Sequence, residues 1–237
     1  GSIETNTEQT SALLRYASGG LSGSPSVIVA SSSEVYGKSE SVPFREDDDV
    51  VYGPTTATRW SYACSKALDE YLALAHHRSH GLNVVVARLF NTVGPRQIGR
   101  YGMVLPRFVS AALAGESLRV FGDGRQVRCF CDVRDVSRAL IGLVGAPAAT
   151  GGIYNVGSSA DISILDLAHR VVSGLDSSSK IELVPYDEAY GAGFEDLRRR
   201  VPDLSRLQQA IDFRPQHDLD STIRAVAEAL VSDGASR

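Results

Sequence analysis

The sequence has little cysteine, no long apolar run and no excess of positive charge, and each absence excludes a class of protein. Three cysteines among 237 residues are too few for a disulfide framework, and their spacing fits no common zinc motif. No apolar run reaches the length of a membrane span. A net charge of -4 gives no general attraction to nucleic acid or to anionic membranes. We therefore expect a cytoplasmic globular protein without a bound metal, a nucleic-acid partner or a membrane partner.

The stretch Ser61–Arg78 is rich in alanine and leucine and contains no glycine or proline, so it predicts a helix. Tyr62 and Lys66 are four residues apart, which places both side chains on one helix face about one turn apart. A cation beside a phenol favours the phenolate, which is a usable base near neutral pH. The same pair also arises by chance on many amphipathic helices, so the spacing alone leaves a purely structural role open.

Two apolar runs flank this helix, at Ser26–Ala30 and Leu82–Leu89, and both are typical of buried parallel strands. Polar residues follow each run, at 31–37 and 91–96. Ligands of open α/β sheets bind at the carboxyl ends of the strands, where these polar residues should lie. The order strand, helix, strand predicts a right-handed βαβ unit of a parallel sheet.

The rest of the chain contains shorter elements of mixed type. Helices are predicted at 3–17, 105–114, 135–143, 164–172, 204–210 and 221–231, and strands at 118–121, 127–133, 153–157 and 181–184. The predicted fold class is α/β, with the C-terminal part of a Rossmann-like parallel sheet and a small mixed α+β lobe. Residues 3–95, with strand 153–157, would form the core, and residues 96–237 the lobe. The acidic run at 46–49 is expected to be solvated.

Six short segments follow one another along the chain: Ser32–Gly37, Tyr62-x-x-x-Lys66, Ala87–Arg96, Gly122–Arg128, Asn155–Gly157 and Arg199–Asp203. As a set they resemble the motifs of the extended short-chain dehydrogenase/reductase family, specifically its NAD-dependent nucleotide-sugar epimerases and dehydratases. The resemblance covers nearly the whole chain from Ile3. It implies a Rossmann-like fold, NAD as the cofactor and a UDP-sugar or other NDP-sugar as the substrate.

By this resemblance, Tyr62 is the base that removes the proton from a sugar hydroxyl while hydride leaves the same carbon for a nicotinamide. Lys66 supports the phenolate and holds the nicotinamide ribose. Ser32 or Ser33 would hydrogen-bond the sugar oxygen as it becomes a ketone. Glu34 lies where decarboxylases and dehydratases of the family have a second acid or base.

The resemblance also assigns residues to ligand binding. Ser31 and Arg88 are implied to contact the cofactor. The residues implied to bind the nucleotide sugar are Asn91, Arg96, Phe121, Arg128 and Arg200. Arginine suits phosphate oxygens in both geometry and charge, and Phe121 would lie against the nucleotide base. Family members dimerise through a four-helix bundle, which implies a homodimer through residues 10–17 and 61–78.

One family feature is missing, because no glycine-rich turn follows a first strand. Gly19–Gly23 has neither the spacing nor a preceding strand, and roughly the first four strands of the family fold have no counterpart. The strand at 26–30 would then have an unpaired apolar edge. We expect a fragment, a split protein whose partner chain supplies the missing half, or a self-associating remnant, and no turnover by this chain alone. A smaller departure is Asp132, where the family usually has an aromatic residue, so the local packing there should differ.

The resemblance leaves the reaction open. Glu34, after two serines, resembles the UDP-glucuronate decarboxylases, whereas 4-epimerases tend to have a small residue there. Dehydratases with an Asp-Glu pair fit less well because Ser33 occupies the Asp position, although those for GDP-mannose keep the Glu. The stretch that begins at Gly193 resembles 4-epimerases. We rank an epimerase first and a decarboxylase second, with a non-catalytic nucleotide-sugar-binding module as the hypothesis from another class.

Overall fold

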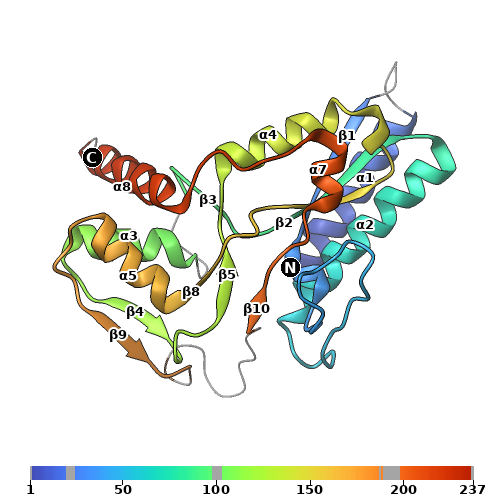
Figure 1. Ribbon diagram of the computed structural model, residues 1–237. Coiled ribbons are helices and arrows are strands. Elements are labelled where there is room, and N and C mark those ends of the chain that lie inside the picture. Colours follow the sequence, from blue (N-terminus) through green and yellow to red (C-terminus); the bar gives the residue numbers. More distant parts are fainter. Residues whose placement is uncertain (1, 20–24, 98–102, 187, 189–197, 236–237) are drawn as a thin grey trace. The chain divides into compact units, whose positions relative to one another are not determined.

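The computed structural model describes residues 2–19, 25–97, 103–186, 188 and 198–235, and its chain divides into two compact units (Figure 1). The first unit is made of Gly1–Phe90, Ser137–Gly157 and Pro202–Arg214, and the second of the three segments between and after them. Residues 137–152 and 202–214 thus join the first unit, whereas we expected only strand 153–157 to return to it. Within the described residues, no helix is long and apolar enough to cross a membrane.

The first unit contains a three-stranded parallel sheet with the strand order β1-β2-β7. Its strands are β1 (Ser26–Ser32), β2 (Asn83–Leu89) and β7 (Ile153–Val156). β2 lies in the middle and buries five consecutive residues, as expected of a strand covered on both faces. β1 forms one edge of the sheet, as the sequence predicted. The α/β fold class and the predicted strand–helix–strand order are therefore confirmed.

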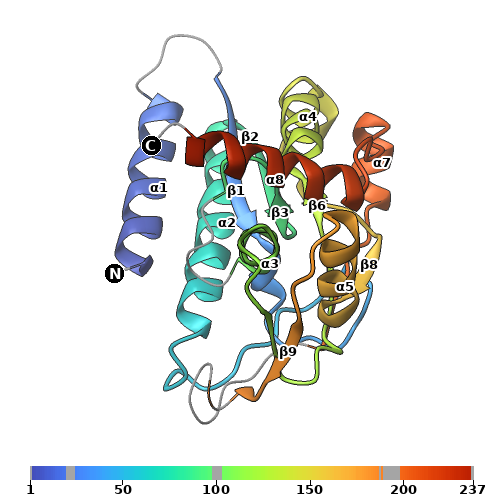
Figure 2. The ribbon, with the colours of Figure 1, turned by 90° about the vertical axis from the view of Figure 1, so that its left-hand side faces the viewer.

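Helices α1 (Ser2–Gly19) and α2 (Trp60–His80) lie side by side and pack against this sheet (Figures 1 and 2). Their shared core with β1 and β2 consists of buried aliphatic side chains, namely Leu14, Ala17, Val29, Ala73, Leu82, Val84 and Val86. α2 ends where the sequence predicted, because Gly81 adopts a left-handed conformation (φ 66°) that glycine allows at no steric cost.

A second apolar cluster of this unit surrounds the short 3-10 helix η1 (Ser33–Tyr36), which follows β1 directly. The rings of Tyr36 and Phe44 stack with their centroids 4.6 Å apart. Asn155 of β7 accepts a hydrogen bond from the Tyr36 hydroxyl at 2.6 Å and donates one to the Phe44 carbonyl at 2.9 Å. The amide of Asn155 therefore connects η1 and the following loop to the sheet.

The remaining elements of the first unit are η2 (Pro147–Ala149), most of α4 (Val133–Val144), and α7 (Ser205–Ile211), which contacts β7.

The second unit is built on three helices, α3 (Val104–Ala114), α5 (Ile164–Gly174) and α8 (Leu219–Ala235), which pack on one another around an aliphatic core (Figure 2). Its strands form short sheets. β4 (Leu118–Phe121) pairs with β9 (Ile181–Val184), and β3 (Thr92–Val93) pairs with β6 (Cys131–Asp132). The third sheet has the order β10-β5-β8, from β10 (Arg199–Arg200), β5 (Val127–Cys129) and β8 (Asp161–Ser163).

The prediction of one continuous strand at 127–133 was wrong. β5 ends at Cys129, β6 covers only Cys131 and Asp132, and α4 begins at Val133. The run changes sheets at residue 130, because β5 pairs with β8 and β10 whereas β6 pairs with β3. The strand then ends at Asp132, whose Oδ1 accepts a hydrogen bond from the Arg134 backbone N–H at 2.8 Å. An aspartate that satisfies an N–H in the first turn is a strong helix start, and it outweighs the alternating pattern around it.

Candidate functional site

The first half of α2 and the carboxyl end of β1 carry all of the predicted catalytic residues. Tyr62 and Lys66 lie one turn apart on α2, and the Tyr62 side chain is exposed. The Lys66 ammonium donates a hydrogen bond to the Ala30 carbonyl at 3.0 Å, so this helix face is directed at the end of β1. Lys66 also lies 3.3 Å from the carboxylate of Asp69. The Lys66 ammonium is thus held near the end of β1, directly before the three serines Ser31–Ser33.

Ser32, Ser33 and Glu34 follow directly as the strand turns into η1. The Ser32 hydroxyl accepts a hydrogen bond from the Glu34 backbone N–H at 3.2 Å and caps this short helix. Ser33 is buried, whereas Glu34 is only partly buried. Since the Ser32 oxygen has a capping role here, its hydroxyl proton remains available as a donor. The catalytic roles of these three residues stay predictions.

Ser31 and Arg88, predicted to bind the cofactor, are both bound to Glu70. The Glu70 carboxylate accepts a hydrogen bond from the Ser31 hydroxyl at 2.5 Å and two from the Arg88 guanidinium, at 3.0 and 2.7 Å. Ser31 and Arg88 are also paired directly across β1 and β2. All three side chains are buried. We call this group of Ser31, Glu70 and Arg88 the carboxylate clamp. It joins α2 to both strands, and cofactor contact by Ser31 or Arg88 stays a prediction.

The electrostatics of the clamp are dominated by Glu70. Burial alone would lower the pKa of Arg88, but the hydrogen bonds and charge of Glu70 more than compensate and raise it. The guanidinium also lies over the ring of Tyr36, 4.7 Å from the ring centroid. Burial raises the pKa of Tyr36 to about 12. Sequence reasoning missed Glu70, although its position four residues after Lys66 places it on the same helix face.

Glu46 corrects the expectation of a solvated acidic run. Its side chain is buried, and it accepts a hydrogen bond from the Asn155 backbone N–H at 2.8 Å. Its backbone carbonyl accepts a further hydrogen bond from Arg88 at 3.0 Å. Asp47 next to it is exposed, as expected. Four consecutive acidic residues do not reveal that the Glu46 side chain points into the protein, because its burial depends on the contact with Asn155 of β7.

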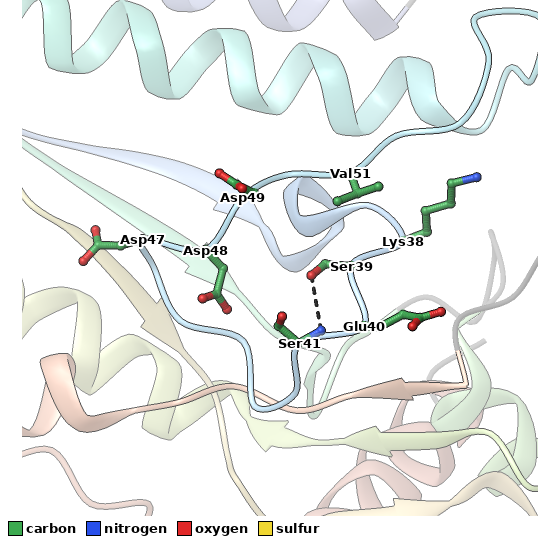
Figure 3. Close-up of a pocket in the computed structure, with 8 residues that line it drawn as sticks. All are labelled: Lys38, Ser39, Glu40, Ser41, Asp47, Asp48, Asp49 and Val51. Carbon is green, nitrogen blue, oxygen red and sulfur yellow. Dashed lines mark hydrogen bonds between the residues drawn. The ribbon is translucent and has the colours of Figure 1, made fainter.

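A surface hollow of about 810 Å³ lies in the loop after η1 (Figure 3). It is lined by Lys38, Ser39, Glu40, Ser41, Asp47, Asp48, Asp49 and Val51. Four carboxylates against one ammonium make it unsuitable for an anionic nucleotide sugar. None of the predicted site residues lines it. In the described part of the chain, no group of three metal-binding side chains is present.

In the second unit, strand pairing brings two of the predicted phosphate-binding residues together. Arg128 of β5 and Arg200 of β10 are direct partners across parallel strands, although they are far apart in the sequence. Partners at one register position point to the same face of the sheet. Arg200 is buried and Arg128 is partly buried, and an Arg128 Nη1 hydrogen bond to the Val127 carbonyl (2.8 Å) fixes its orientation. Two guanidinium groups on one face are suited to an anionic group.

The remaining three candidates lie in separate settings. Phe121 at the end of β4 has the Arg107 guanidinium over its ring, 5.0 Å from the centroid. The Asn91 side-chain amide donates a hydrogen bond from Nδ2 to the Cys129 carbonyl at 2.8 Å, and its Oδ1 can act as an acceptor. Arg96 is exposed, with a left-handed backbone (φ 66°). Their contact with a nucleotide stays a prediction.

Asp132 shows what replaces the aromatic residue expected at its position. Its carboxylate is buried and accepts hydrogen bonds from the Arg134 side chain and from the Thr222 hydroxyl of α8. Burial alone would raise the pKa of Asp132, but these hydrogen bonds outweigh it and lower the pKa to about 2. A hydrogen-bonded carboxylate therefore occupies this position, and the difference from the packing of the family stays a prediction.

Among the described residues, those of the candidate site fit one end of a nicotinamide dinucleotide. The exposed Tyr62 phenol and the Lys66 ammonium are suited to ribose hydroxyls and the nicotinamide side. The turn after β1 leads into the four-residue helix η1 and lacks the glycine spacing that holds a pyrophosphate. Gly20–Gly23 and the segment 193–197, named in the sequence analysis, lie outside the described residues.

The chain is similar in sequence to curated nucleotide-sugar enzymes. The chain is 44% identical over 214 residues to the UDP-N-acetyl-alpha-D-glucosaminuronate decarboxylase of Bacillus cytotoxicus, covering 90% of this chain and 65% of the relative. It is 31% identical over 210 residues to UDP-glucuronic acid decarboxylase 1 of Arabidopsis thaliana, covering 89% and 45%. The chain therefore spans only about half to two thirds of the length of these relatives.

Solved structures share the fold. One is the UDP-N-acetylglucosamine 4-epimerase of Methanobrevibacter ruminantium in complex with UDP-N-acetylmuramic acid, with a TM-score of 0.84 and 28% identity over 97% of this chain and 70% of that one. The epimerase Mth375 of Methanothermobacter thermautotrophicus has a TM-score of 0.87 at 22% identity, covering 99% and 67%. The model of the "NAD dependent epimerase/dehydratase family" matches residues 1–157. The resemblance seen in the motifs is confirmed, and the chain belongs to the NAD-dependent epimerase/dehydratase family.

Proposed function

We propose that this chain carries the proton-transfer centre of an NAD-dependent enzyme that oxidises C4 of a UDP-sugar, as an epimerase or a related family enzyme. The observation that carries the proposal is the position of Lys66. Its ammonium lies against the Ala30 carbonyl at the carboxyl end of β1, one helical turn from an exposed tyrosine. A phenolate beside an ammonium can take the proton from a sugar hydroxyl.

The chain's own residues would divide the work of this step. Tyr62 removes the hydroxyl proton at C4, and the carbon becomes a ketone as its hydride leaves. When bound, NAD supplies the acceptor for that hydride. Lys66 holds a ribose hydroxyl and stabilises the Tyr62 phenolate. Ser32 or Ser33 donates a hydrogen bond to the oxygen on which negative charge develops, which stabilises the transition state.

The second unit would bind the nucleotide. Arg128 and Arg200, paired across β5 and β10, supply positive charge for the diphosphate. Phe121 offers a ring for the base, while Asn91 and Arg96 offer further polar contacts. We propose these roles from the motif positions, supported for the two arginines by their pairing.

A decarboxylase is the second candidate, and it fits the same centre equally well. Its specific support is Glu34 together with the name of the 44% identical relative, a UDP-sugar acid decarboxylase. Oxidation at C4 of a sugar acid places a ketone β to the C6 carboxylate, and such a β-keto acid loses CO₂ readily. Epimerase and decarboxylase thus share the Tyr62 step and differ only in the chemistry after the ketone has formed.

Assembly completes the proposal. We propose a homodimer in which α1 and α2 of two chains form a four-helix bundle, because both helices expose large apolar side chains. These are Leu13, Tyr16, Leu68 and Tyr71. We also propose that residues outside this sequence, on the same or a partner chain, supply the glycine-rich turn for NAD. A reducing, cytoplasmic location is supported by three cysteines that form no disulfide.

The test begins with bound cofactor and product. The protein is purified and denatured, the supernatant is assayed for nicotinamide, and UDP-sugars and UDP-sugar acids are then offered with added NAD. New UDP-sugars with inverted C4, or CO₂ and a pentose product, identify the reaction. UDP-dependent thermal stabilisation without cofactor or product would support the binding module instead.

Two tyrosines of α2 provide a matched pair of variants. Tyr62→Phe should abolish turnover in the active assembly while UDP affinity stays near normal, because only the proton-transfer group is removed. Tyr71→Phe, on the same helix, keeps the apolar ring that the proposed bundle would bury and should leave turnover unchanged. Loss of both turnover and UDP affinity in Tyr62→Phe would contradict the role given to Tyr62.

A further inference from the structure

Asp69 is a buried carboxylate beside the proposed catalytic lysine. It lies on α2 three residues after Lys66, and none of its surface is exposed. Its Oδ2 is 3.3 Å from the Lys66 ammonium. Its Oδ1 is also buried and has no hydrogen-bond partner among the described residues. Lys66 is thus the one ionic partner that the described structure gives this carboxylate.

Such a group is poorly explained as a stabilising ion pair. Exposed pairs on a helix surface contribute little, and a buried pair regains its desolvation cost only with good geometry and further hydrogen bonds. Asp69 has one satisfied oxygen, whereas the neighbouring Glu70 accepts hydrogen bonds on both. The two adjacent carboxylates therefore have different hydrogen-bonding roles. Glu70 joins secondary-structure elements, and Asp69 contacts the lysine.

The hydrogen-bonding capacity of Lys66 explains what Asp69 can do. An ammonium has three N–H donors and no acceptor. One donor is taken by the Ala30 carbonyl of β1 and one by Asp69 of α2. These two anchors come from different elements, so they fix the position of the nitrogen and leave a single donor for another group.

We propose that Asp69 is a positioning residue that holds the Lys66 ammonium and leaves one of its N–H groups for Tyr62 or for a ligand hydroxyl. The proposal rests on the function proposed above for Tyr62 and Lys66. Asp69 also supplies a negative charge 3.3 Å from the Lys66 ammonium. It acts through Lys66 and touches no reacting atom.

The chain is well suited to a direct test, because it contains only three lysines, Lys38, Lys66 and Lys180. Lys38 and Lys180 are exposed and serve as internal references. The folded chain is labelled with a trace of acetic anhydride at fixed pH, and acetylation at each lysine is measured by peptide mass spectrometry. The unprotonated amine attacks a carbonyl carbon of the anhydride and acetate leaves, so a lysine that a carboxylate holds as its ammonium reacts slowly.

Asp69→Asn keeps the shape of the side chain and removes its charge. We expect Lys66 labelling, relative to the two reference lysines, to rise by about two- to fivefold, the range expected for losing an ion pair on a helix. An unchanged ratio would overturn the proposal. Asp69→Glu, which keeps the charge, should stay closer to the parent chain than to Asp69→Asn.

Controls separate positioning from folding. Asp220→Asn removes the exposed Arg170–Asp220 pair of the second unit and should not change Lys66 labelling. If Asp69→Asn fails to fold, Asp69→Ser replaces it with the same expectation. The parent chain adds a test without any variant, since Lys66 labelling as fast as that of Lys38 would also overturn the proposal.

The labelling needs neither cofactor nor substrate, so its outcome is independent of the proposed function. Faster Lys66 labelling in Asp69→Asn, with no UDP-sugar turnover in any assembly, supports the positioning role and counts against the enzyme proposal. Turnover in the parent assembly, with labelling unchanged by Asp69→Asn, supports the enzyme and overturns the role of Asp69.

Discussion

The two units assemble their candidate residues in different ways. In the first unit, Tyr62, Lys66 and Glu70 come from one face of one helix, and Ser31 to Glu34 from the end of the adjacent strand. In the second unit, Arg128 and Arg200 come from strands that are far apart in the sequence and meet only through the β5–β10 pairing. The first group is a local arrangement, and the second is created by tertiary structure.

This difference predicts different responses to mutation. The clamp residues of the first unit are buried and share hydrogen bonds. Changing one of them should therefore lower the free energy of unfolding more than it affects catalysis directly. The arginines of the second unit are brought together by backbone pairing, which does not depend on their side chains. Changing one should therefore reduce ligand affinity more than folding, although Arg200 is itself buried. Four predictions examine this contrast, in order of decreasing effect.

The largest effect is expected for Arg88→Met. It leaves the Glu70 carboxylate buried without its cation, which should lower the free energy of unfolding by about 3–5 kcal/mol. Urea unfolding, followed by fluorescence of the single tryptophan Trp60, which is buried, measures it. The double variant Glu70→Gln/Arg88→Met removes both charges and should recover most of the loss. Equal stability of single and double variants would show that the ion pair is not the important contact.

Arg200→Ala should mainly weaken nucleotide binding. Loss of a charge-assisted hydrogen bond to phosphate corresponds to about 1.5–3 kcal/mol, or roughly a 10- to 150-fold rise in the Kd for UDP. Isothermal titration calorimetry measures it, with exposed Arg119→Ala of the same unit as the matched control. A variant that unfolds while its UDP affinity per folded molecule is unchanged would remove the contrast between the units.

Asp132 should make the stability of the second unit depend on acid pH. Its pKa is lowered from 3.8 to about 2 in the folded chain, so its contribution is complete above about pH 4 and is lost as the pH falls towards 2. The shift corresponds to about 2 kcal/mol. Unfolding midpoints at pH 6 and pH 2.5 measure it. Asp132→Asn should flatten this dependence, whereas Asp123→Asn, which changes an exposed residue of the same unit, should not.

The smallest effect is expected for Ser163→Ala. Ser163 caps α5 by accepting a hydrogen bond from the Asp166 backbone N–H at 3.0 Å, and its loss should cost about 1 kcal/mol. UDP affinity should be unchanged, since α5 carries none of the candidate residues. Ser110→Ala, at an exposed position of α3, should be neutral or slightly stabilising because alanine favours a helix. A matching loss at Ser110 would show that the effect is not capping.

Local pattern was enough for the parts of the fold that depend on neighbouring residues. The long apolar runs of β1 and β2, the alanine-rich α2 and the Gly81 stop predicted those elements. Pattern failed at 127–133, where the chain passes from one sheet to another and a side-chain cap then begins a helix. The sequence pattern also gave no role to Glu70 and Asp69, because acidic residues on a helix usually lie on its solvent-exposed face.

The sequence by itself determined the βαβ core, the Tyr62–Lys66 pair and the family, because helical and strand periodicity and motif order are encoded within short stretches. Only the tertiary structure decided the partners of the charged side chains: Glu70 with Arg88, Asp69 with Lys66, and Arg128 beside Arg200. The physical reason is burial. A carboxylate or guanidinium removed from water must find its partner wherever packing places one, and that place is set by elements distant in the chain.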